Sequence, residues 1–154
     1  MKNQSSINIT NRRASFNYFL TASYEAGIIL TGTEIKSIRE GKANLTDSYC
    51  IFKASELWVK NLHISEYKEG SYNNHIPKRD RKLLLKRNEL HKLQSRIKER
   101  GVTIIPVKLY LNERGFAKLE IALARGKKMF DKRETMKTNE ANREMSRIRK
   151  SYQR

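Results

Sequence analysis

Apolar residues recur at every second position in several short runs of this chain, which is the period of a β-strand. In the first run, Phe16, Tyr18, Leu20, Ala22 and Tyr24 are apolar or aromatic, and three of the four residues between them are polar. Further runs begin at residue 28 and cover residues 48–53, 57–65, 107–111 and 119–123. About six short antiparallel strands with two to three helices predict a mainly β fold, most simply a closed OB-like barrel. Closure would also remove exposed strand edges.

The stretch from Thr31 to Gly41 predicts a short helix between two strands. Thr31 and Glu34 have the spacing of a capping box, and Gly41 suits the left-handed position after a helix. Ile35 and Ile38 share one face, so the apolar surface of this helix is narrow. The other faces carry three cations, which are Lys36, Arg39 and Lys42.

A second helix is predicted over residues 79–100, after a polar loop at residues 66–78. One stripe of this segment is apolar, and Gly101 suits its end. The stripe consists of Leu83, Leu90, Leu93 and Ile97. Lys and Arg occupy most of the remaining surface, with too few acids to balance them. Such a face favours contacts with phosphates that do not depend on sequence.

The charge of the chain is large and uneven. The sequence has 33 Lys and Arg against 16 Asp and Glu, a net charge of +17. Residues 1–77 hold nine basic and seven acidic residues, while residues 78–154 hold 24 and nine. An excess of this size, confined to one half, favours a polyanionic partner such as nucleic acid over a simple solubility role.

The residues offer little support for catalysis. Cys50 is the single cysteine, so no internal disulfide forms, and none of the three histidines has a neighbouring ligand at metal spacing. Glycine-rich phosphate loops and nucleophile elbows are absent. We therefore expect a binding protein without enzyme activity, metal or other cofactor. The sequence lacks a long apolar run and an apolar signal core, so we expect a soluble, cytoplasmic protein, most simply a monomer.

Residues 126–154 differ in kind from the rest of the chain. They contain ten Lys or Arg, four Asp or Glu and few large apolar residues, a composition typical of disorder in isolation. Ala141, Met145, Ile148 and Tyr152 nevertheless recur at helical spacing. This segment either folds as a helix against a partner or stays a solvated tail. The expected organisation is a flexible N-terminus at 1–10, a barrel at 11–125 and a basic tail at 126–154.

Five motifs occur in order and together resemble a known family. They are Asn11-Arg12-Arg13-Ala14, Tyr24-Glu25-Ala26-Gly27, the stretch 31–49, Arg81-Lys82-Leu83-Leu84-Leu85, and Gly126-Lys127-Lys128 followed by Asp131-Lys132-Arg133. From residue 11 onward, the chain closely resembles the SsrA-binding protein (small protein B) family of bacterial trans-translation. The resemblance implies an OB-like barrel that binds the tRNA-like domain of transfer-messenger RNA. It also implies delivery of the alanyl form, with elongation factor Tu, to stalled ribosomes, so that the nascent peptide is tagged for degradation.

The resemblance also implies which residues touch the partners. The barrel contacts with RNA would come from Asn11, Arg13, Tyr24, Glu25, Tyr49, Leu84 and Lys118, to which we add the cations Lys36 and Lys86. The tail would enter the messenger channel, with its first residues nearest the decoding centre. Its candidate residues are Gly126, Lys127, Lys128, Phe130, Asp131, Lys132, Arg133, Met145 and Ile148. Phe16 and Phe130 stand where some members carry histidine.

The role of Glu25 stays open at the level of sequence. Glu25 either accepts hydrogen bonds from base edges, orients a cation such as Arg13, or is a turn residue.

The family fold would place Ile35 and Ile38 as a plug at one end of the barrel, with the three helix cations facing solvent. The alternative function is a general OB-fold RNA-binding or ribosomal protein without a dedicated RNA partner.

Overall fold

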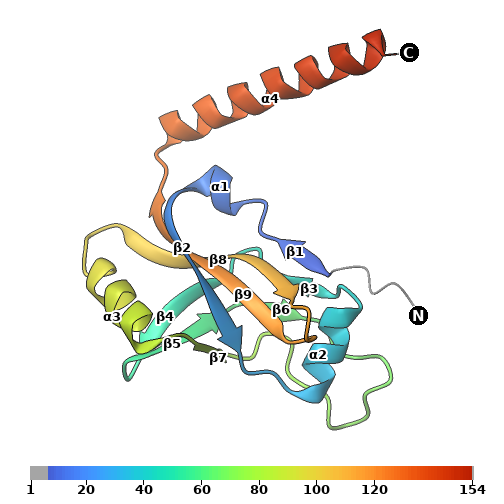
Figure 1. Cartoon of the computed structure of the whole chain (residues 1–154), viewed down its shortest axis with the longest axis vertical. Helices are drawn as coiled ribbons and strands as arrows, with labels where there is room; N and C mark the ends of the chain where they lie inside the picture. The colour runs from blue at the N-terminus through green and yellow to red at the C-terminus, as the bar shows by residue number, and fades with distance from the viewer. Residues whose placement is uncertain (1–6, 154) are drawn as a thin grey trace.

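The computed structural model describes residues 7–153, which form a mainly antiparallel β structure with four helices (Figure 1). The strands are β1 (Asn8–Thr10), β2 (Tyr18–Ile28), β3 (Ala43–Asn44), β4 (Tyr49–Lys53), β5 (Glu56–Lys60), β6 (His63–Ile64), β7 (Arg81–Leu84), β8 (Val102–Leu111) and β9 (Ala117–Gly126). The helices are α1 (Ala14–Asn17), α2 (Gly32–Arg39), α3 (Arg87–Arg96) and α4 (Met129–Tyr152). None of the described helices has the length and apolar content needed to cross a membrane.

Six of the strands close into a ring. Their order is β8-β4-β5-β7-β2-β9, and β9 pairs back onto β8. β1 pairs with residues 108–110 of β8, beyond the point where β4 pairs with that strand at Ile104. β3 and β6 form a separate pair. The predicted hairpin is confirmed as β4 and β5, in which Tyr49 pairs with Lys60 and Lys53 with Glu56. The structure thus confirms an antiparallel β fold of about six main strands.

The core fills the inside of the ring. Leu119, Ile121 and Leu123 of β9 are buried at every second position, as their alternation predicts. Ile38 of α2 and Leu93 of α3 belong to the same cluster, so both helices contribute to the core. Cys50 is buried in this cluster as well, and burial raises the pKa of its thiol. The cysteine is therefore a small core residue.

Helix α2 follows its sequence signals closely. The Thr31–Glu34 capping box is present, with the Thr31 N–H donating to Glu34 Oε2 at 2.9 Å. Gly41 has a φ of +74° directly after the helix. Ile38 is fully buried and Ile35 half-buried, whereas Lys36 and Arg39 are exposed.

The predicted boundaries of the second helix and of the first strand are wrong. Residues 81–84 form strand β7 rather than the start of a helix, and α3 runs only from Arg87 to Arg96, so it ends before Gly101 rather than at it. β7 fills the gap between β2 and β5, a pairing that local leucine spacing does not encode. The first strand run is also displaced: residues 14–17 form a single helical turn, and β2 continues unbroken through residues 25–27, where it pairs with β9.

Helix α4 stands apart from the ring (Figure 1). It is 24 residues long and has no buried residue. The sequence predicts two to three helices. The structure has four within residues 7–153, because the tail is helical and the single turn α1 carries no periodic signal. Of the N-terminal stretch expected to be flexible, residues 8–10 form β1, and residues 1–6 lie outside the described residues.

Candidate nucleic-acid interface

Three of the predicted RNA contacts line one hollow beside α1. Asn11, Arg13 and Tyr49 border a cavity of about 420 Å³ together with Asn17 and Ser48. Asn11 is held in place because its Nδ2 donates to the Pro106 carbonyl at 3.0 Å and its N–H donates to Val107 at 2.8 Å. Its buried Oδ1 has no hydrogen-bond partner within residues 7–153, so an acceptor is available at this position. We call this cavity the α1 hollow.

Four other predicted contacts line a second hollow, at the far end of β2. Glu25, Leu84, Lys86 and Lys118 border a cavity of about 460 Å³. Gly27 pairs with Leu84 on one side and with Lys118 on the other, and a Cβ at Gly27 would lie 3.3 Å from the Leu84 Cβ. Glycine thus lets β7 approach β2 closely, while Leu84 remains 51% exposed. We call this cavity the β2 hollow.

Glu25 has a partner that the sequence did not indicate. The Tyr110 hydroxyl donates a hydrogen bond to the Glu25 carboxylate, whereas Arg13 borders the α1 hollow rather than the cavity that Glu25 lines. Partial burial, the hydrogen bond and the Glu25 charge raise the pKa of Tyr110 to about 12. Lys108 Nζ lies 5.1 Å from the centre of the Tyr110 ring. Glu25 is consequently a positioned carboxylate on a strand, and the interpretation as a turn residue is excluded.

Tyr24 and Lys36 lie apart from both hollows. Tyr24 is half-buried and borders a groove beside α3 with His91, Lys92 and Arg96. Lys36 lies on α2, where its Nζ is 5.5 Å from the centre of the Tyr67 ring. The nine predicted barrel contacts therefore divide into two groups and two single residues. From Tyr18, beside the α1 hollow, to Glu25, β2 spans about 20 Å at the usual strand rise.

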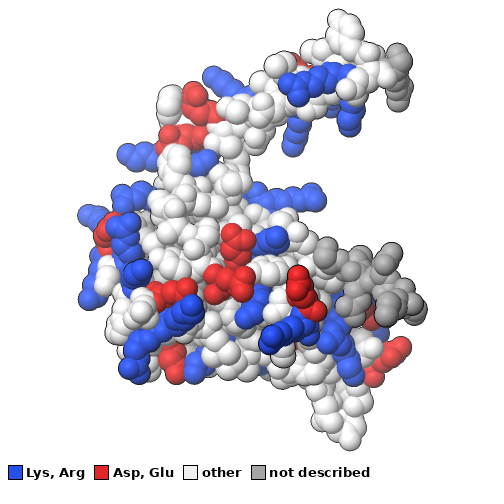
Figure 2. Space-filling model, viewed as in Figure 1, with Lys and Arg blue, Asp and Glu red and all other residues white. Residues whose placement is uncertain are grey.

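Charge is distributed over both the ring and α4. In the view of Figure 2, Lys and Arg gather around the position of α3 and along α4. α3 contributes Arg87, Lys92 and Arg96. Within residues 7–153 no three His, Cys, Asp or Glu side chains are grouped so that they could hold a metal ion. The clustered side chains are cationic, which suits binding of a polyanion.

Lys127 joins the ring to α4. Its Nζ donates to the Ser15 carbonyl at 2.9 Å and to Thr135 Oγ1 at 3.0 Å, and it lies 5.0 Å from the centre of the Phe19 ring. Its N–H donates to the Asn17 carbonyl at 2.8 Å. One lysine thus contacts α1, β2 and the second turn of α4, a junction between the ring and the tail that the sequence did not predict.

The other predicted tail residues lie on or near the start of α4. Gly126 ends β9, and Lys128 is the residue before the helix. Asp131 and Lys132 are half-buried and Arg133 is exposed. The apolar side chains face solvent, with exposures of 68% for Phe130, 59% for Met145 and 53% for Ile148.

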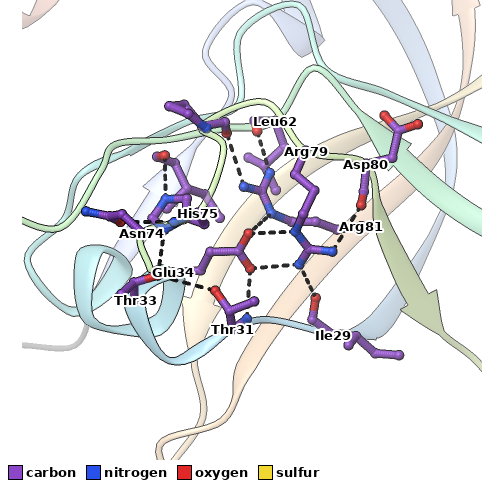
Figure 3. A network of polar contacts seen from close by, with 12 residues as sticks. Ile29, Thr31, Thr33, Glu34, Leu62, Asn74, His75, Arg79, Asp80 and Arg81 are labelled. Atoms are coloured by element: carbon purple, nitrogen blue, oxygen red, sulfur yellow. Dashed lines mark hydrogen bonds and ion pairs between the residues drawn. The ribbon is translucent and has the colours of Figure 1, made fainter. Parts of the chain in front are cut away.

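The structure contains a buried ion-pair network that the sequence did not predict (Figure 3). Glu34 and Arg81 are fully buried, with Arg81 Nε 3.0 Å from Glu34 Oε1, and Arg79 Nη2 is 2.9 Å from Glu34 Oε2. Arg81 also donates to the Leu62 and Pro77 carbonyls. Burial would raise the pKa of Glu34, but the hydrogen bonds from Arg79 and Thr31 and the two positive charges lower it overall. The capping box identified Glu34, but no local pattern linked it to arginines 45 and 47 positions away.

His75 anchors the polar loop to the same helix. Its Nδ1 lies 2.9 Å from Thr33 Oγ1 and its Nε2 lies 2.9 Å from the Ile64 carbonyl. The carbonyl can only accept, so Nε2 carries a proton and donates to it, while Nδ1 shares a hydrogen bond with the Thr33 hydroxyl. The histidine is therefore a structural residue, and the network fixes α2 at its end of the ring.

Comparison with known proteins gives one consistent result. The sequence model of the family described as SmpB protein matches residues 8–151. The chain is 58% identical over 145 residues to an SsrA-binding protein of Bacteroides thetaiotaomicron, covering 94% of this chain and 97% of the relative. It is 60% identical over 142 residues to an SsrA-binding protein of Phocaeicola vulgatus, covering 92% and 95%. A solved structure described as "tmRNA-SmpB: a journey to the center of the bacterial ribosome" matches with a TM-score of 0.69 and 48% identity, covering 80% of this chain and 86% of that one.

Proposed function

The chain belongs to the SmpB protein family, and from this premise we propose that it is an RNA-binding adaptor of trans-translation. It binds the tRNA-like domain of transfer-messenger RNA and delivers that RNA to stalled ribosomes. The ribosome is rescued and the nascent peptide is tagged for degradation. The adaptor itself catalyses no reaction. The relatives' name as SsrA-binding proteins and the similarity to a tmRNA–SmpB structure support this function.

The six-strand ring serves in this proposal as an OB-like barrel. Each strand of the ring pairs with two neighbours, and two helices contribute core residues, which supports this assignment. We take residues 11–125 as the RNA-binding unit and residues 126–154 as the ribosome-binding unit. The protein acts as a monomer, in complex with the alanylated RNA and elongation factor Tu.

One observation carries the RNA-binding proposal: Glu25, Leu84, Lys86 and Lys118 meet in the β2 hollow although they come from distant parts of the chain. They provide a carboxylate, an exposed apolar group and two cations. This combination suits RNA, since cations contact phosphates, a carboxylate accepts from base edges and apolar groups contact unstacked bases. The α1 hollow, with Asn11, Arg13 and Tyr49, adds a second contact region about 20 Å away along β2.

Helix α4 serves the ribosome. It carries cations and a thin apolar stripe, and none of its residues is fully buried, so its exposed apolar residues are available to a partner. We propose that it lies in the empty messenger channel with its first residues near the decoding centre. In the free protein the helix is in equilibrium with disordered chain, because a thin stripe stabilises an isolated helix only marginally.

The test is selectivity for RNA at physiological salt. The protein should bind the tRNA-like domain more tightly than a hairpin of equal length, whereas a general RNA-binding protein would lose both affinities together as salt rises. Equal affinity for both RNAs would overturn the dedicated-adaptor proposal in favour of the general one.

Glu25 offers a sharper test because its local partner is known. Tyr110→Phe removes the hydroxyl that Glu25 accepts but leaves the carboxylate in place. If Glu25 accepts hydrogen bonds from RNA, Glu25→Ala should weaken binding of the tRNA-like domain about tenfold or more, and Tyr110→Phe should weaken it less. Equal losses would mean that Glu25 only positions Tyr110.

A further inference from the structure

A third hollow adjoins the proposed RNA-binding surface. It has a volume of about 430 Å³ and lies between α2, the end of β2 and the β8–β9 turn, which share one end of the ring in Figure 1. The residues that matter here are Ile35, Arg39, Leu84, Arg114, Phe116 and Lys118. Leu84 and Lys118 also border the β2 hollow, so the two cavities are adjacent. We call this cavity the Phe116 hollow.

The backbone of Phe116 is held by hydrogen bonds at the edge of this hollow. Its N–H donates to Asn112 Oδ1 at 2.9 Å, and its carbonyl accepts the Asn112 N–H at 2.9 Å. Gly115, with a φ of +82°, makes the turn that these bonds close. The ring is nevertheless 64% exposed and therefore adds little to the core. An exposed aromatic ring on a backbone held in this way offers a stacking face to a flat partner.

The charge of the hollow selects for an anion. Arg39, Arg114 and Lys118 line it, and no carboxylate does. Within residues 7–153 these three side chains make no ion pair, so their charge is not neutralised locally. The β2 hollow, by contrast, includes Glu25 and Glu89. The Phe116 hollow is thus the more purely cationic of the two.

We propose that the Phe116 hollow binds one unstacked nucleotide of the partner RNA, with the base on the Phe116 ring and a phosphate between Arg39 and Arg114. Aromatic stacking with nearby cations is how proteins hold unpaired bases. The shared border with the β2 hollow favours RNA over an acidic protein segment, because an RNA strand that contacts Leu84 and Lys118 is already next to this hollow. The inference rests on the proposed function and adds a subsite to it.

The experiment measures affinity of the full-length protein for the tRNA-like domain. Phe116→Leu keeps an apolar side chain but removes the stacking face, and should weaken binding about 5- to 100-fold. Phe116→Trp should retain parental affinity or exceed it. Tyr72→Leu is the matched control, because Tyr72 is 95% exposed in the polar loop and should be replaceable without effect.

The two arginines give an independent measurement. Arg39→Gln and Arg114→Gln should each reduce the slope of log affinity against log salt concentration by about 0.7–0.9, the signature of one lost phosphate contact. Phe116→Leu should leave that slope unchanged. Lys68→Gln, an exposed cation of the polar loop, is the charge control.

The outcomes separate the subsite from the function. If the parent prefers the tRNA-like domain but Phe116→Leu and both arginine variants bind like the parent, no nucleotide occupies the hollow. If RNA affinity holds but these variants lose peptide tagging on stalled ribosomes, the occupant is a different partner and the proposal is wrong. If the parent shows no preference for this RNA, the proposed function fails first.

Discussion

The ring and helix α4 are stabilised in opposite ways. In the ring, alternate side chains point into one core, and even two ionised groups, Glu34 and Arg81, are fully buried. In α4, none of the 24 residues is fully buried. The ring therefore derives its stability from packing, whereas α4 depends on local helix energetics and on the few contacts at its start. The same charged residue types are thus structural in the ring and available for binding on α4.

The largest expected difference between the regions is in stability. Arg81→Met removes one member of the buried network and leaves Glu34 with Arg79 alone, so it should lower the free energy of unfolding by about 3–5 kcal/mol. Arg149→Met, on exposed α4, should change it by less than about 0.5 kcal/mol. Urea denaturation measures both. A cost below about 1 kcal/mol for Arg81→Met would show that the network contributes little.

Breaking α4 should affect function without affecting the ring. Proline at an internal helix position costs about 3 kcal/mol, so Ile148→Pro should reduce peptide tagging on stalled ribosomes at least tenfold. Because no residue of α4 is fully buried and Ile148 is 53% exposed, global unfolding and affinity for transfer-messenger RNA should match the parent. Ile148→Ala keeps helix propensity and should lose less tagging. If Ile148→Pro tags peptides at the parental rate, α4 acts as a flexible polycation and its helical form is not needed.

The junction between the regions should have an intermediate effect. Lys127→Met removes the hydrogen bonds to Ser15 and Thr135, worth about 1 kcal/mol together at this half-buried position. Distances between spin labels at positions 55 and 152 should then spread more widely, with RNA affinity unchanged. Lys128→Met is the matched control, since its side chain is exposed. If both variants give identical distance distributions, Lys127 does not set the orientation of α4 relative to the ring.

The smallest expected effect is on acid stability. The network lowers the pKa of Glu34 below its ordinary value of 4.5, so the unfolded chain binds the proton more readily than the folded one. The stabilisation is therefore complete above about pH 4.5 and is lost as pH falls through the depressed value. The free energy of unfolding of Glu34→Gln should be lower than that of the parent at neutral pH, and it should change less with pH below pH 4.5. Glu140→Gln, on α4, should follow the parental curve.

Local patterns predicted a good part of the fold. Alternation identified the β4–β5 hairpin and the inward residues of β9, and the capping box and Gly41 bounded α2. The assignment of residues 81–84 to a helix failed because a four-residue strand among leucines has no distinct period. For the interface, motifs named the residues, but only the fold divided them between the α1 and β2 hollows.

The strand and helix periods, the helix caps and the helical stripe of the tail can be read from the sequence, because each depends on residues a few positions apart, and the excess of positive charge follows from composition. The closure of the ring, the pairing of Glu34 with Arg79 and Arg81, and the shared cavity of Glu25, Leu84 and Lys118 are visible only in the folded chain. The same holds for the contacts of Phe116 and Lys127. These contacts join residues far apart in the chain, and they form because packing the core of the ring leaves each strand a single register.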